Sequence, residues 1–399
     1  MTETTSKNGP STPAESAPST GAVCVGILGA GQLGRMLGLA AIRMGLSVRF
    51  LDRAQSGATE GLGETHVGDW TDPEVLRRFI QGCAVITTEN EWAPAAAVEA
   101  ALRDGDRDGG EMRPGSRSLD RIADKGRQKQ TLEAAGIPTA PFALAADEAE
   151  AARAFEALGG AVMLKRRRGS YDGYGNHTAH DAAALREGWT RLHGEDGLLL
   201  EQWVPFEREL SVIVARSTTG EVQTYPVAYT EQRDHRCHAT VVPAGVPDGM
   251  VEAARRIGRD VVQAFDLVGV TAVELFATED GRLLVNEVAP RPHNTGHYTI
   301  EGCVTSQFEN HLRAVLGWPL GATDLRAPAA VMINLIGDRE GEVALGTLPR
   351  ALSSADVAVH CYGKRDVRPR RKMGHVTCLG DDPTETRARA EAAAEKIQL

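Results

Sequence analysis

The hydrophobic and polar positions of the first hundred residues alternate between short apolar runs and one long amphipathic stretch. The apolar runs predict strands at residues 23–28, 47–51 and 84–88. The amphipathic stretch predicts a helix over residues 32–44, which Gly45 ends. Strands that alternate with helices are typical of a doubly wound parallel sheet, in which ligands bind at the carboxyl ends of the strands. We therefore expect an N-terminal α/β domain over residues 21–118.

From residue 119 the pattern changes to strands that are joined by short polar turns. The strand candidates are residues 161–165, 198–202, 209–216 and 222–227. The last helix of this region has clear end signals, because Ser306 and Glu309 form a capping-box pattern and Gly317 follows the last apolar position. The pattern predicts an α+β domain over residues 119–317. A smaller β-rich domain is expected over 318–399, with strands near 330–335 and 357–361.

Two apolar runs near residue 280 are each interrupted by a glutamate. If Asp280 and Gly281 form a two-residue turn, Glu279 faces Arg282, and Glu274 then lies opposite Glu287 on one face of the hairpin. Carboxylates in such a pair lie about 5 Å apart and repel each other unless a proton or a divalent cation lies between them. We predict that Glu274 and Glu287 bind magnesium that carries nucleotide phosphates.

The simpler interpretation of this hairpin is two solvated glutamates on an exposed turn. Their neighbours argue against it, because both glutamates interrupt apolar strands where an unpaired charge is costly. The next residues form a stiff segment in which Pro290 and Pro292 flank a cation, and an imidazole and an amide follow. The polar members of this segment are Arg291, His293 and Asn294. We interpret the whole region as a built site.

Composition and charge restrict the class of protein. The chain has 399 residues, which is enough for two or three domains, and its apolar content of 42% and charged content of 25% are ordinary for a globular protein. The formal net charge of −10, without a long Lys/Arg face to offset it, argues against a nucleic-acid-binding protein. Small anionic ligands remain compatible with local basic clusters.

Cysteine spacing and hydropathy indicate the expected location. The six cysteines form neither a Cys-x-x-Cys pair nor a metal-binding pattern, so a reducing cytoplasm with free thiols fits best. The sequence has no uninterrupted apolar stretch of about 18 residues, and we expect no membrane span. Residues 1–20 are rich in Ser, Thr, Pro, Glu and Ala and lack the basic start and apolar core of a secretory signal. We expect a disordered leader there.

The first glycine-rich segment follows a strand and opens a helix. It contains Gly29, Gly31 and Gly34, and Asp52 lies 18 residues beyond the last glycine at the end of the next strand. This pattern is typical of a dinucleotide-binding loop, which keeps a nicotinamide oxidoreductase among the alternatives. The glycines alone require only a tight turn with backbone N–H groups directed at an anion, so a monophosphate or a sugar could bind instead.

A second glycine-rich segment follows the strand at 161–165. Four consecutive cations, residues 165–168, precede Gly169, Gly173 and Gly175. A flexible hairpin of this kind can close over phosphates, with a lysine that supplies charge and a loop that supplies N–H donors. It is not a Walker loop, because Gly-Lys-Ser/Thr is absent. The simpler interpretation is a solvated basic turn.

Two further segments could contact a nucleotide or an anion. The strand at 198–202 leads into an extended segment with Glu209 shortly after it, where backbone groups can bind a purine edge and an acid can accept from ribose hydroxyls. By itself it could equally be a buried strand. Between Lys364 and His375 the chain concentrates basic residues, which suggests a phosphate site, although a surface charge run is the commoner explanation.

Together these residues resemble the ATP-grasp superfamily and, within it, the 5-(carboxyamino)imidazole ribonucleotide synthases of purine biosynthesis. The resemblance covers about residues 23–380. Its most specific parts are residues 286–302, 306–309 and 371–375. It implies an ATP-grasp architecture of mixed class, α/β plus α+β, with an N-terminal doubly wound parallel-sheet domain, a central ATP-grasp domain and a small C-terminal β-rich domain.

The resemblance implies roles for the residues of the nucleotide site. Lys165 and Lys125 would contact ATP, Glu209 would bind the ribose, and Glu274 and Glu287 match the magnesium ligands. The loop that closes over the phosphates would comprise Gly169, Ser170, Tyr171, Asp172, Gly173 and Gly175. Adenine would bind at Glu201, Gln202, Trp203 and Val204. Gln232 and Asn286 also match nucleotide-site positions, although strand parity would turn Asn286 away from Glu287.

The reaction that the resemblance implies joins bicarbonate to the amine of 5-aminoimidazole ribonucleotide at the expense of ATP. Bicarbonate would attack the γ-phosphoryl group to give carboxyphosphate, which releases carbon dioxide beside the amine. The expected catalytic residues are Arg291, His293, Asn294 and Lys372. The residues expected to bind the aminoimidazole nucleotide are Gln32, Leu33, Glu89, Lys364, Arg371 and Lys372. A homodimer is implied, and the product could pass directly to the following mutase.

The sequence departs from the family pattern at four positions. Tyr174 stands where the family commonly has Lys or Arg, and Gln232 stands where a His is often found. Arg370 replaces a usual Gly, and Thr88 replaces a usual Tyr. These changes concern loop contacts and nucleotide affinity and leave the carboxylate pair untouched.

Two other enzymes are weighed against this assignment. A formate-using transformylase of the same pathway shares Pro-Arg-Pro-His but typically continues with Asp, where this chain has Asn294, and lacks the terminal motif at 371–375. A Rossmann-type oxidoreductase would leave the loop at 165–175 and the carboxylate pair without a purpose. A non-catalytic binding module would require that the loop substitutions had abolished turnover.

Overall fold

The computed structural model describes residues 23–104, 110–169, 174–234 and 236–399. The expected leader at 1–20 lies outside the described residues. So do four members of the loop that the sequence assigns to the ATP phosphates: Ser170, Tyr171, Asp172 and Gly173.

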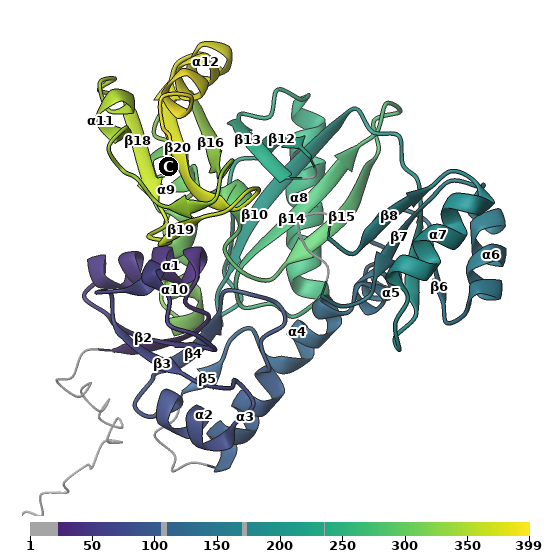
Figure 1. Cartoon of the computed structure of the whole chain (residues 1–399), viewed down its shortest axis with the longest axis horizontal. Helices are drawn as coiled ribbons and strands as arrows, with labels where there is room; N and C mark the ends of the chain where they lie inside the picture. Colours follow the sequence, from purple (N-terminus) through teal and green to yellow (C-terminus); the bar gives the residue numbers. More distant parts are fainter. Residues whose placement is uncertain (1–22, 105–109, 170–173, 235) are drawn as a thin grey trace, which may run out of the picture.

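The N-terminal part of the chain is a parallel sheet with helices on its faces (Figure 1). Its strand order is β3-β2-β1-β4-β5, and every pairing in it is parallel. The strands are β1 (Cys24–Leu28), β2 (Ser47–Asp52), β3 (Glu64–Val67), β4 (Val85–Thr88) and β5 (Glu111–Met112). The helices are α1 (Gln32–Arg43), α2 (Pro73–Ile80), α3 (Ala95–Asp104) and α4 (Ser116–Ala123). The predicted doubly wound domain is confirmed.

The central part begins with α5 (Lys125–Ala134) and a small antiparallel sheet, which forms the lobe at the right of Figure 1. The strand order of this sheet is β6-β9-β7-β8. Its strands are β6 (Phe142–Ala145), β7 (Val162–Arg166), β8 (Asn176–Ala179) and β9 (Leu198–Gln202). The apolar sides of α6 (Glu148–Ala157) and α7 (Ala182–Leu192) pack against this sheet in one hydrophobic cluster.

A second, larger sheet runs through the middle of the molecule and into its C-terminal part. Its order is β15-β14-β10-β12-β13-β16-β20-β18, with β11 (Val222–Thr224) beside β10. The central strands are β10 (Arg208–Arg216), β12 (Ala228–Arg233), β13 (Arg236–Val242), β14 (Gly269–Ala277) and β15 (Leu283–Ala289). The C-terminal strands are β16 (Ala329–Ile336), β18 (Val357–Cys361) and β20 (Lys372–Gly380). The two parts are therefore joined edge to edge by the β13–β16 pair.

Helices cover this sheet at both ends. One hydrophobic cluster joins α8 (Asp248–Ala264) to β10 and β14, and another joins α12 (Pro383–Ala394) to β16 and β20. The helix α10 (Gln307–Leu316) begins where the sequence predicts, because the Ser306 hydroxyl accepts from the N–H of Glu309. It ends at Gly317, which has the left-handed φ of 70° that glycine adopts without strain.

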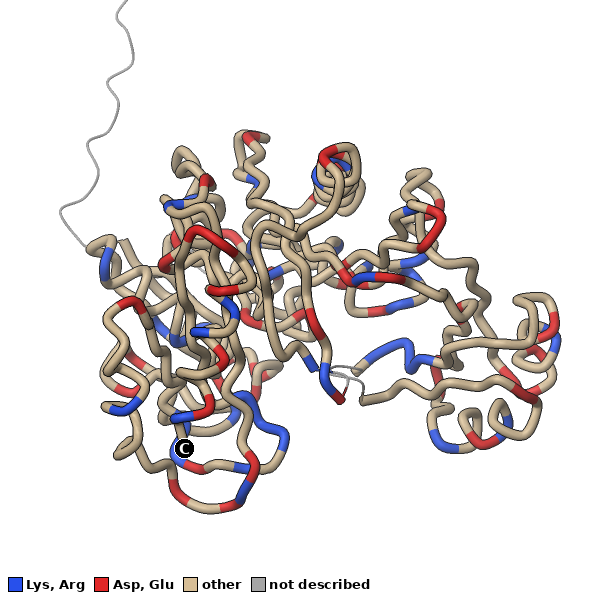
Figure 2. Tube along the Cα trace, turned by 90° about the horizontal axis from the view of Figure 1, so that it is seen from above, with Lys and Arg blue, Asp and Glu red and all other residues tan. Residues whose placement is uncertain are grey.

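Because the large sheet crosses the expected boundary near 317, β16, β18 and β20 do not form a sheet of their own. Only β17 (Gly341–Glu342) and β19 (Asp366–Val367), among the described C-terminal strands, form a separate two-stranded sheet. We propose units with boundaries near residues 118 and 317, since the strand pattern changes at the first and the helix α10 ends at the second. Basic and acidic residues are interspersed along the described trace, as Figure 2 shows. No helix of the described residues is long and apolar enough to cross a membrane.

His311 of α10 connects the N-terminal sheet to the central one. Its Nδ1 accepts from the backbone N–H of Val270 at 3.0 Å, so its Nε2 carries the proton and donates to Oγ1 of Thr87 at 2.8 Å. The ring is completely buried, and burial lowers its pKa to about 3. His311 is therefore neutral in the folded protein.

We predict that this histidine makes the protein acid-labile. Its pKa in the folded state lies below the value of about 6.5 for an unfolded chain, so its stabilising contribution is complete above pH 6.5 and is lost as pH falls toward 3. We expect the free energy of unfolding, measured in urea from pH 4.5 to 7.5, to fall less steeply with decreasing pH in His311→Gln than in the wild-type protein. Below pH 6.5 the two slopes should differ by about 1.4 kcal/mol per pH unit. The exposed His193→Gln should keep the wild-type slope, and equal slopes in all three proteins would contradict the assignment.

Arg370 is held in a left-handed backbone conformation, with φ of 72°, in the loop before β20. This explains why glycine is usual at this position of the family pattern. A left-handed conformation costs a residue with a side chain about 1–2 kcal/mol, while glycine loses about 0.5–1 kcal/mol more chain entropy on folding.

Arg370→Gly should therefore raise the free energy of unfolding by roughly 0.5–1 kcal/mol. Arg368→Gly is the matched control, because Arg368 is exposed in the same loop and has no positive φ. It should lower the free energy of unfolding. Chemical denaturation of both variants checks the prediction, and a loss of stability in Arg370→Gly would contradict it.

Candidate functional site

The hairpin of β14 and β15 pairs Glu274 with Glu287, as the sequence predicts, but by a different route. The predicted two-residue turn is wrong, because Thr278 and not Glu279 lies opposite Arg282 and closes a three-residue loop. Gly281 takes φ of 80° in this loop, and a type I turn that ends in a left-handed residue is the usual three-residue connection.

A β-bulge restores the register that the longer turn shifts. Leu275 pairs with Val285, whereas Glu274 pairs with Glu287, so Asn286 is an extra residue on β15. The two register changes cancel and leave the glutamates opposite each other. The bulge also breaks the strand parity that would turn Asn286 away from Glu287. Oδ1 of Asn286 lies 3.5 Å from Nζ of Lys165.

The two glutamates have opposite electrostatic environments. Burial, and then the carboxylates of Glu287 and Glu209, raise the pKa of Glu274 to about 8. Burial also disfavours the charged form of Glu287, but the ammonium of Lys125, 3.0 Å away, outweighs it and lowers the pKa of Glu287 to about 2. The pair therefore favours a proton or a cation held with the two carboxylates over two unbalanced charges.

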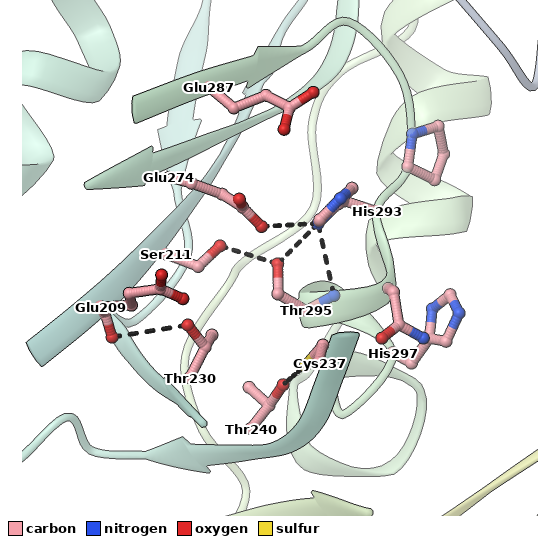
Figure 3. A network of polar contacts seen from close by, with 12 residues as sticks. Glu209, Ser211, Thr230, Cys237, Thr240, Glu274, Glu287, His293, Thr295 and His297 are labelled. Atoms are coloured by element: carbon pink, nitrogen blue, oxygen red, sulfur yellow. Dashed lines mark hydrogen bonds and ion pairs between the residues drawn. The ribbon is translucent and has the colours of Figure 1, made fainter. Parts of the chain in front are cut away.

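A polar network surrounds Glu274 (Figure 3). Oε1 of Glu274 lies 3.8 Å from Nδ1 of His293, and the same ring nitrogen lies 2.9 Å from Oγ1 of Thr295. Thr295 in turn shares a hydrogen bond of 2.7 Å with Ser211, the residue that pairs with Glu274 across β10 and β14. The imidazole that the sequence assigns to the site is thus held beside the carboxylate pair.

The donor set fits a magnesium ion that is bound together with nucleotide phosphates. Glu274 and Glu287 offer carboxylate oxygens and Asn286 an amide oxygen, which are the ligands that magnesium prefers. The described residues contain no cluster of three or more His, Cys, Asp or Glu that could hold a metal by itself. Magnesium commonly takes only one or two carboxylates and completes its shell with substrate phosphates and water.

Cations that approach from other elements face these carboxylates. Lys125, at the start of α5, pairs with Glu287, and Lys165, at the end of β7, pairs with Glu201 of β9. The almost completely buried Lys129 binds the same Glu201. Burial opposes charge on Glu201, but the two lysines lower its pKa to about 2. The two lysines expected at the phosphates thus lie near one centre, and Lys129 joins them.

The arginines that follow Lys165 have structural partners. Nη1 of Arg167 donates to the backbone oxygen of Asp196, and Nε of Arg167 donates to Asp124, the residue that caps α5. Arg168 forms an ion pair of 2.9 Å with Asp120, and Arg166 donates to the carbonyl of Leu192. The two described loop glycines, Gly169 and Gly175, have φ of 70° and 84°.

The segment that the sequence assigns to adenine leaves the small sheet at the carboxyl end of β9, where the chain becomes exposed. The N–H groups of Gln202 and Trp203 donate to backbone oxygens at 2.8 and 2.9 Å, and Trp203 remains 40% exposed, with Val204 next to it. Glu209 lies on β10. Burial raises the pKa of Glu209, and this effect outweighs the hydrogen bond from Gln232, which lowers it. Gln232 thus contacts the acid that the sequence assigns to ribose.

The first glycine loop binds a side chain of the protein itself. The N–H groups of Gly31 and Gly34 both donate to the carboxylate of Glu89, each at 2.6 Å. Asp52 accepts from the N–H of Ala30 at 2.8 Å instead of being directed at a ribose. A Cβ at residue 31 would lie 2.7 Å from Oε1 of Glu89, so the glycine is required by this carboxylate. Burial raises the pKa of Glu89 despite these two donors.

Residues of the N-terminal and C-terminal parts meet at this loop. Nζ of Lys364 donates to Oε1 of Gln32 at 2.9 Å and to the carbonyl of Lys372. Arg371 is directed elsewhere, since its Nη1 donates to the carbonyl of Asp366 at 2.9 Å. The side chain of Leu33 is buried in the hydrophobic core under α1.

Arg291 pairs with a residue that the sequence analysis did not assign to the site. Its Nε donates to Glu91 at 2.8 Å, and Glu91 follows the N-terminal strand β4. Thr88, another departure from the family pattern, is completely buried, and its hydroxyl donates to the carbonyl of Asn90. The ion pair between Arg291 and Glu91 ties the segment after β15 to the carboxyl end of β4 in the N-terminal sheet.

Several polar residues around the site were missed by sequence reasoning. Gln307 accepts from the N–H of His293 and donates to its carbonyl, at 3.0 and 2.7 Å. Asn294 pairs with Asn334 of β16. The signal that identified Glu274, a polar residue inside an apolar strand, was equally present at Asn334.

Two antiparallel sheets, with paired carboxylates on one and a lysine of the other directed at them, are the arrangement of an ATP-grasp enzyme. Family profiles agree: the ATP-grasp domain matches residues 130–308, the ribonucleotide synthetase preATP-grasp domain matches 23–108, and the phosphoribosylaminoimidazole carboxylase C-terminal domain matches 330–389. An ATP-grasp ligase uses ATP with a divalent cation, so the expected cofactors agree with this class.

Curated relatives are similar over almost the whole chain. The N5-carboxyaminoimidazole ribonucleotide synthase of Synechococcus elongatus is 37% identical over 378 residues, which are 94% of this chain and 94% of that protein. The phosphoribosylaminoimidazole carboxylase of Schizosaccharomyces pombe is 37% identical over 92% of this chain, but the match spans only 66% of its length. The match to the chloroplastic phosphoribosylaminoimidazole carboxylase of Vigna aconitifolia spans 64% of the length of that protein. The chain belongs to the N5-carboxyaminoimidazole ribonucleotide synthase family.

Solved structures of this family have the same fold. The synthase of Aspergillus clavatus in complex with ATP superposes with a TM-score of 0.85 at 34% identity and covers 94% of this chain and 99% of that one. The synthase of the same organism in complex with ADP and 5-aminoimidazole ribonucleotide gives a TM-score of 0.84 at 33% identity, with the same coverage. The family, architecture and enzyme class expected from the sequence are confirmed. The oxidoreductase alternative is rejected.

Proposed function

We propose that this protein carboxylates 5-aminoimidazole ribonucleotide with bicarbonate at the expense of ATP, a step of purine biosynthesis. The observation that carries the proposal is the facing pair Glu274 and Glu287, with Lys125 and Lys165 directed at the same centre. Such a centre can neutralise the charge of a triphosphate, which phosphoryl transfer requires. The substrate is inferred from the family, because the structure of a relative has been solved in complex with ADP and 5-aminoimidazole ribonucleotide.

The nucleotide would bind between the two antiparallel sheets. Lys125 and Lys165 would turn from Glu287 and Glu201 to the phosphates, and Glu209 with Gln232 would bind the ribose. Adenine would lie along residues 201–204. When bound, magnesium would be held by Glu274 and Glu287 and would offset phosphate charge. The described loop glycines Gly169 and Gly175, with residues 170–173, would close over the phosphates.

Bicarbonate would react between the carboxylate pair and the segment that follows β15. Its oxygen attacks the γ-phosphorus of ATP and releases ADP, and the carboxyphosphate that results breaks down to carbon dioxide and phosphate. The substrate amine then attacks carbon dioxide and loses a proton. Arg291, His293 and Asn294 would hold the anions, with Lys372 beside them. The support is that Arg291 and His293 are already oriented by Glu91 and Thr295.

The aminoimidazole nucleotide would bind where the N-terminal and C-terminal parts meet. Glu89 fills the glycine loop and offers acceptors, so this loop would receive an N–H-bearing group and not a phosphate. Lys364 and Lys372 would bind the phosphate, with the backbone of Gln32 and Leu33 nearby. Arg371 would join them only after it leaves the carbonyl of Asp366.

The reaction is tested by ADP release with each substrate omitted in turn. We expect ADP release that depends on both 5-aminoimidazole ribonucleotide and bicarbonate, with no stimulation by formate. Release that depends on formate would instead support the transformylase. ADP release that depends on neither bicarbonate nor formate would contradict both assignments.

Glu287→Gln should abolish magnesium-dependent ADP formation and leave the fold intact. The change removes a charged oxygen ligand of the metal, and it also leaves Lys125 without the carboxylate that pairs with it, so the melting temperature should fall while the fold is retained. Steady-state ADP release and a thermal melt measure the two effects. Glu279→Gln, on the exposed turn of the same hairpin, is the control and should retain activity. Wild-type turnover in Glu287→Gln would overturn the metal assignment.

The remaining expectations about partners and location stay proposals. A cytoplasmic enzyme agrees with the six cysteines, which are all free thiols. We propose a homodimer, with no nucleic-acid or membrane partner, that passes its product to the following mutase. A size measurement in solution tests the first, and a coupled assay with the mutase tests the last.

A further inference from the structure

The amide of Asn294 is bound by a second amide from the C-terminal part of the chain. Nδ2 of Asn294 donates to Oδ1 of Asn334 at 2.9 Å, and Nδ2 of Asn334 donates to Oδ1 of Asn294 at 2.6 Å. Both side chains are only 5% exposed. Asn334 lies on β16, whereas Asn294 follows the carboxylate hairpin by five residues beyond β15.

A backbone carbonyl decides which way round the two amides face. Nδ2 of Asn334 also donates to the carbonyl of Cys237 on β13 at 2.9 Å, and a carbonyl can only accept. The NH₂ group of Asn334 is therefore fixed toward Cys237. A reciprocal pair then requires that Asn294 present its NH₂ to Oδ1 of Asn334, because the opposite orientation would bring two donors and two acceptors together.

The pair leaves Asn294 with a defined donor. An amide NH₂ has two hydrogens, and the pair uses only the one on the same side as Oδ1. The other hydrogen lies outside the pair. The backbone around it is also fixed, because Gln307 binds both the N–H and the carbonyl of the preceding residue, His293.

The surroundings hold Asn334 itself in place. Its partner across β16 and β20 is His375, and paired residues share one face of a sheet. The ring of His375 lies 4.9 Å from that of His297, three residues after Asn294. The segment that carries Asn294 is thus docked at two points on the same face of the C-terminal strands.

We propose that Asn334 is a positioning residue for the carboxylation reaction. It holds Asn294 so that an N–H, and not the amide oxygen, meets bicarbonate or carboxyphosphate. Asn334 does not itself touch the reacting atoms and acts through Asn294. This inference rests on the proposed function, in which Asn294 holds these anions.

The test is a double-mutant cycle on steady-state kinetics with Asn334→Ala, Asn294→Ala and the double variant. We expect Asn334→Ala to raise KM for bicarbonate about tenfold, the usual effect of losing a hydrogen bond to a charged group, while KM for ATP is unchanged. In the Asn294→Ala background, Asn334→Ala should have little further effect, because its partner is already gone. Effects that multiply in the double variant would overturn the proposal.

Asn310→Ala separates positioning from a general loss of packing. Asn310 is also a completely buried amide, and it is bonded to Tyr225 and Gly321. This variant should lower the melting temperature without a selective change in KM for bicarbonate. A rise in KM for bicarbonate equal to that of Asn334→Ala would overturn the proposal.

A second variant keeps the test valid if Asn334→Ala does not fold. Asn334→Leu has a similar volume but can neither donate to nor accept from the amide of Asn294, so it should show the same selective rise in KM for bicarbonate. An unchanged KM would overturn the proposal. Failure of the proposed function would be distinct, since wild-type enzyme would then release no ADP in response to bicarbonate.

Discussion

Repulsion between two carboxylates on one sheet face is the constraint around which this site is organised. Glu274 and Glu287 lie directly opposite each other among apolar strand residues, where like charges are costly. The two glutamates meet this cost differently: Lys125 stabilises the charge of Glu287, while burial and the neighbouring carboxylates raise the pKa of Glu274. A divalent cation between the two carboxylates would remove the repulsion.

The cations that balance this pair come from separate parts of the chain. Lys125 begins α5, Lys165 is the last residue but one of β7, and Arg291 follows β15. Each one is held by a carboxylate of the protein, at Glu287, Glu201 and Glu91 respectively. The carboxylates of the protein thus keep these positive charges paired and oriented.

The sequence could predict the parts of the fold that depend on local patterns. The strands β1, β2 and β4, the ends of α10 and the facing glutamates follow from apolar periodicity, capping residues and spacing. The short strands β3 and β5 were not predicted. The pairing of Glu274 with Glu287 was right although the turn was wrong, because the bulge at Asn286 compensates the longer loop. A bulge depends on tertiary packing and has no clear mark in a single sequence.

Contacts between distant segments could not be predicted in the same way. Glu91 meets Arg291 because the segment after β15 lies against the N-terminal sheet, and Asn334 meets Asn294 because the same segment lies against β16. The glycine loop shows the opposite difficulty, since its sequence is typical of phosphate binding. Its donors are instead occupied by Glu89, whose place opposite the loop is set by the β1–β4 pairing.

The sheet that runs unbroken from β15 to β18 has a consequence for how the molecule comes apart. The backbone hydrogen bonds between β13 and β16 belong to one ladder, so the central and C-terminal strands cannot lose their pairing separately without exposing an edge on both. They should melt as one cooperative unit in calorimetry. The four-stranded lobe of β6 to β9 has its own hydrogen-bond ladder and core, so local unfolding can be confined to it.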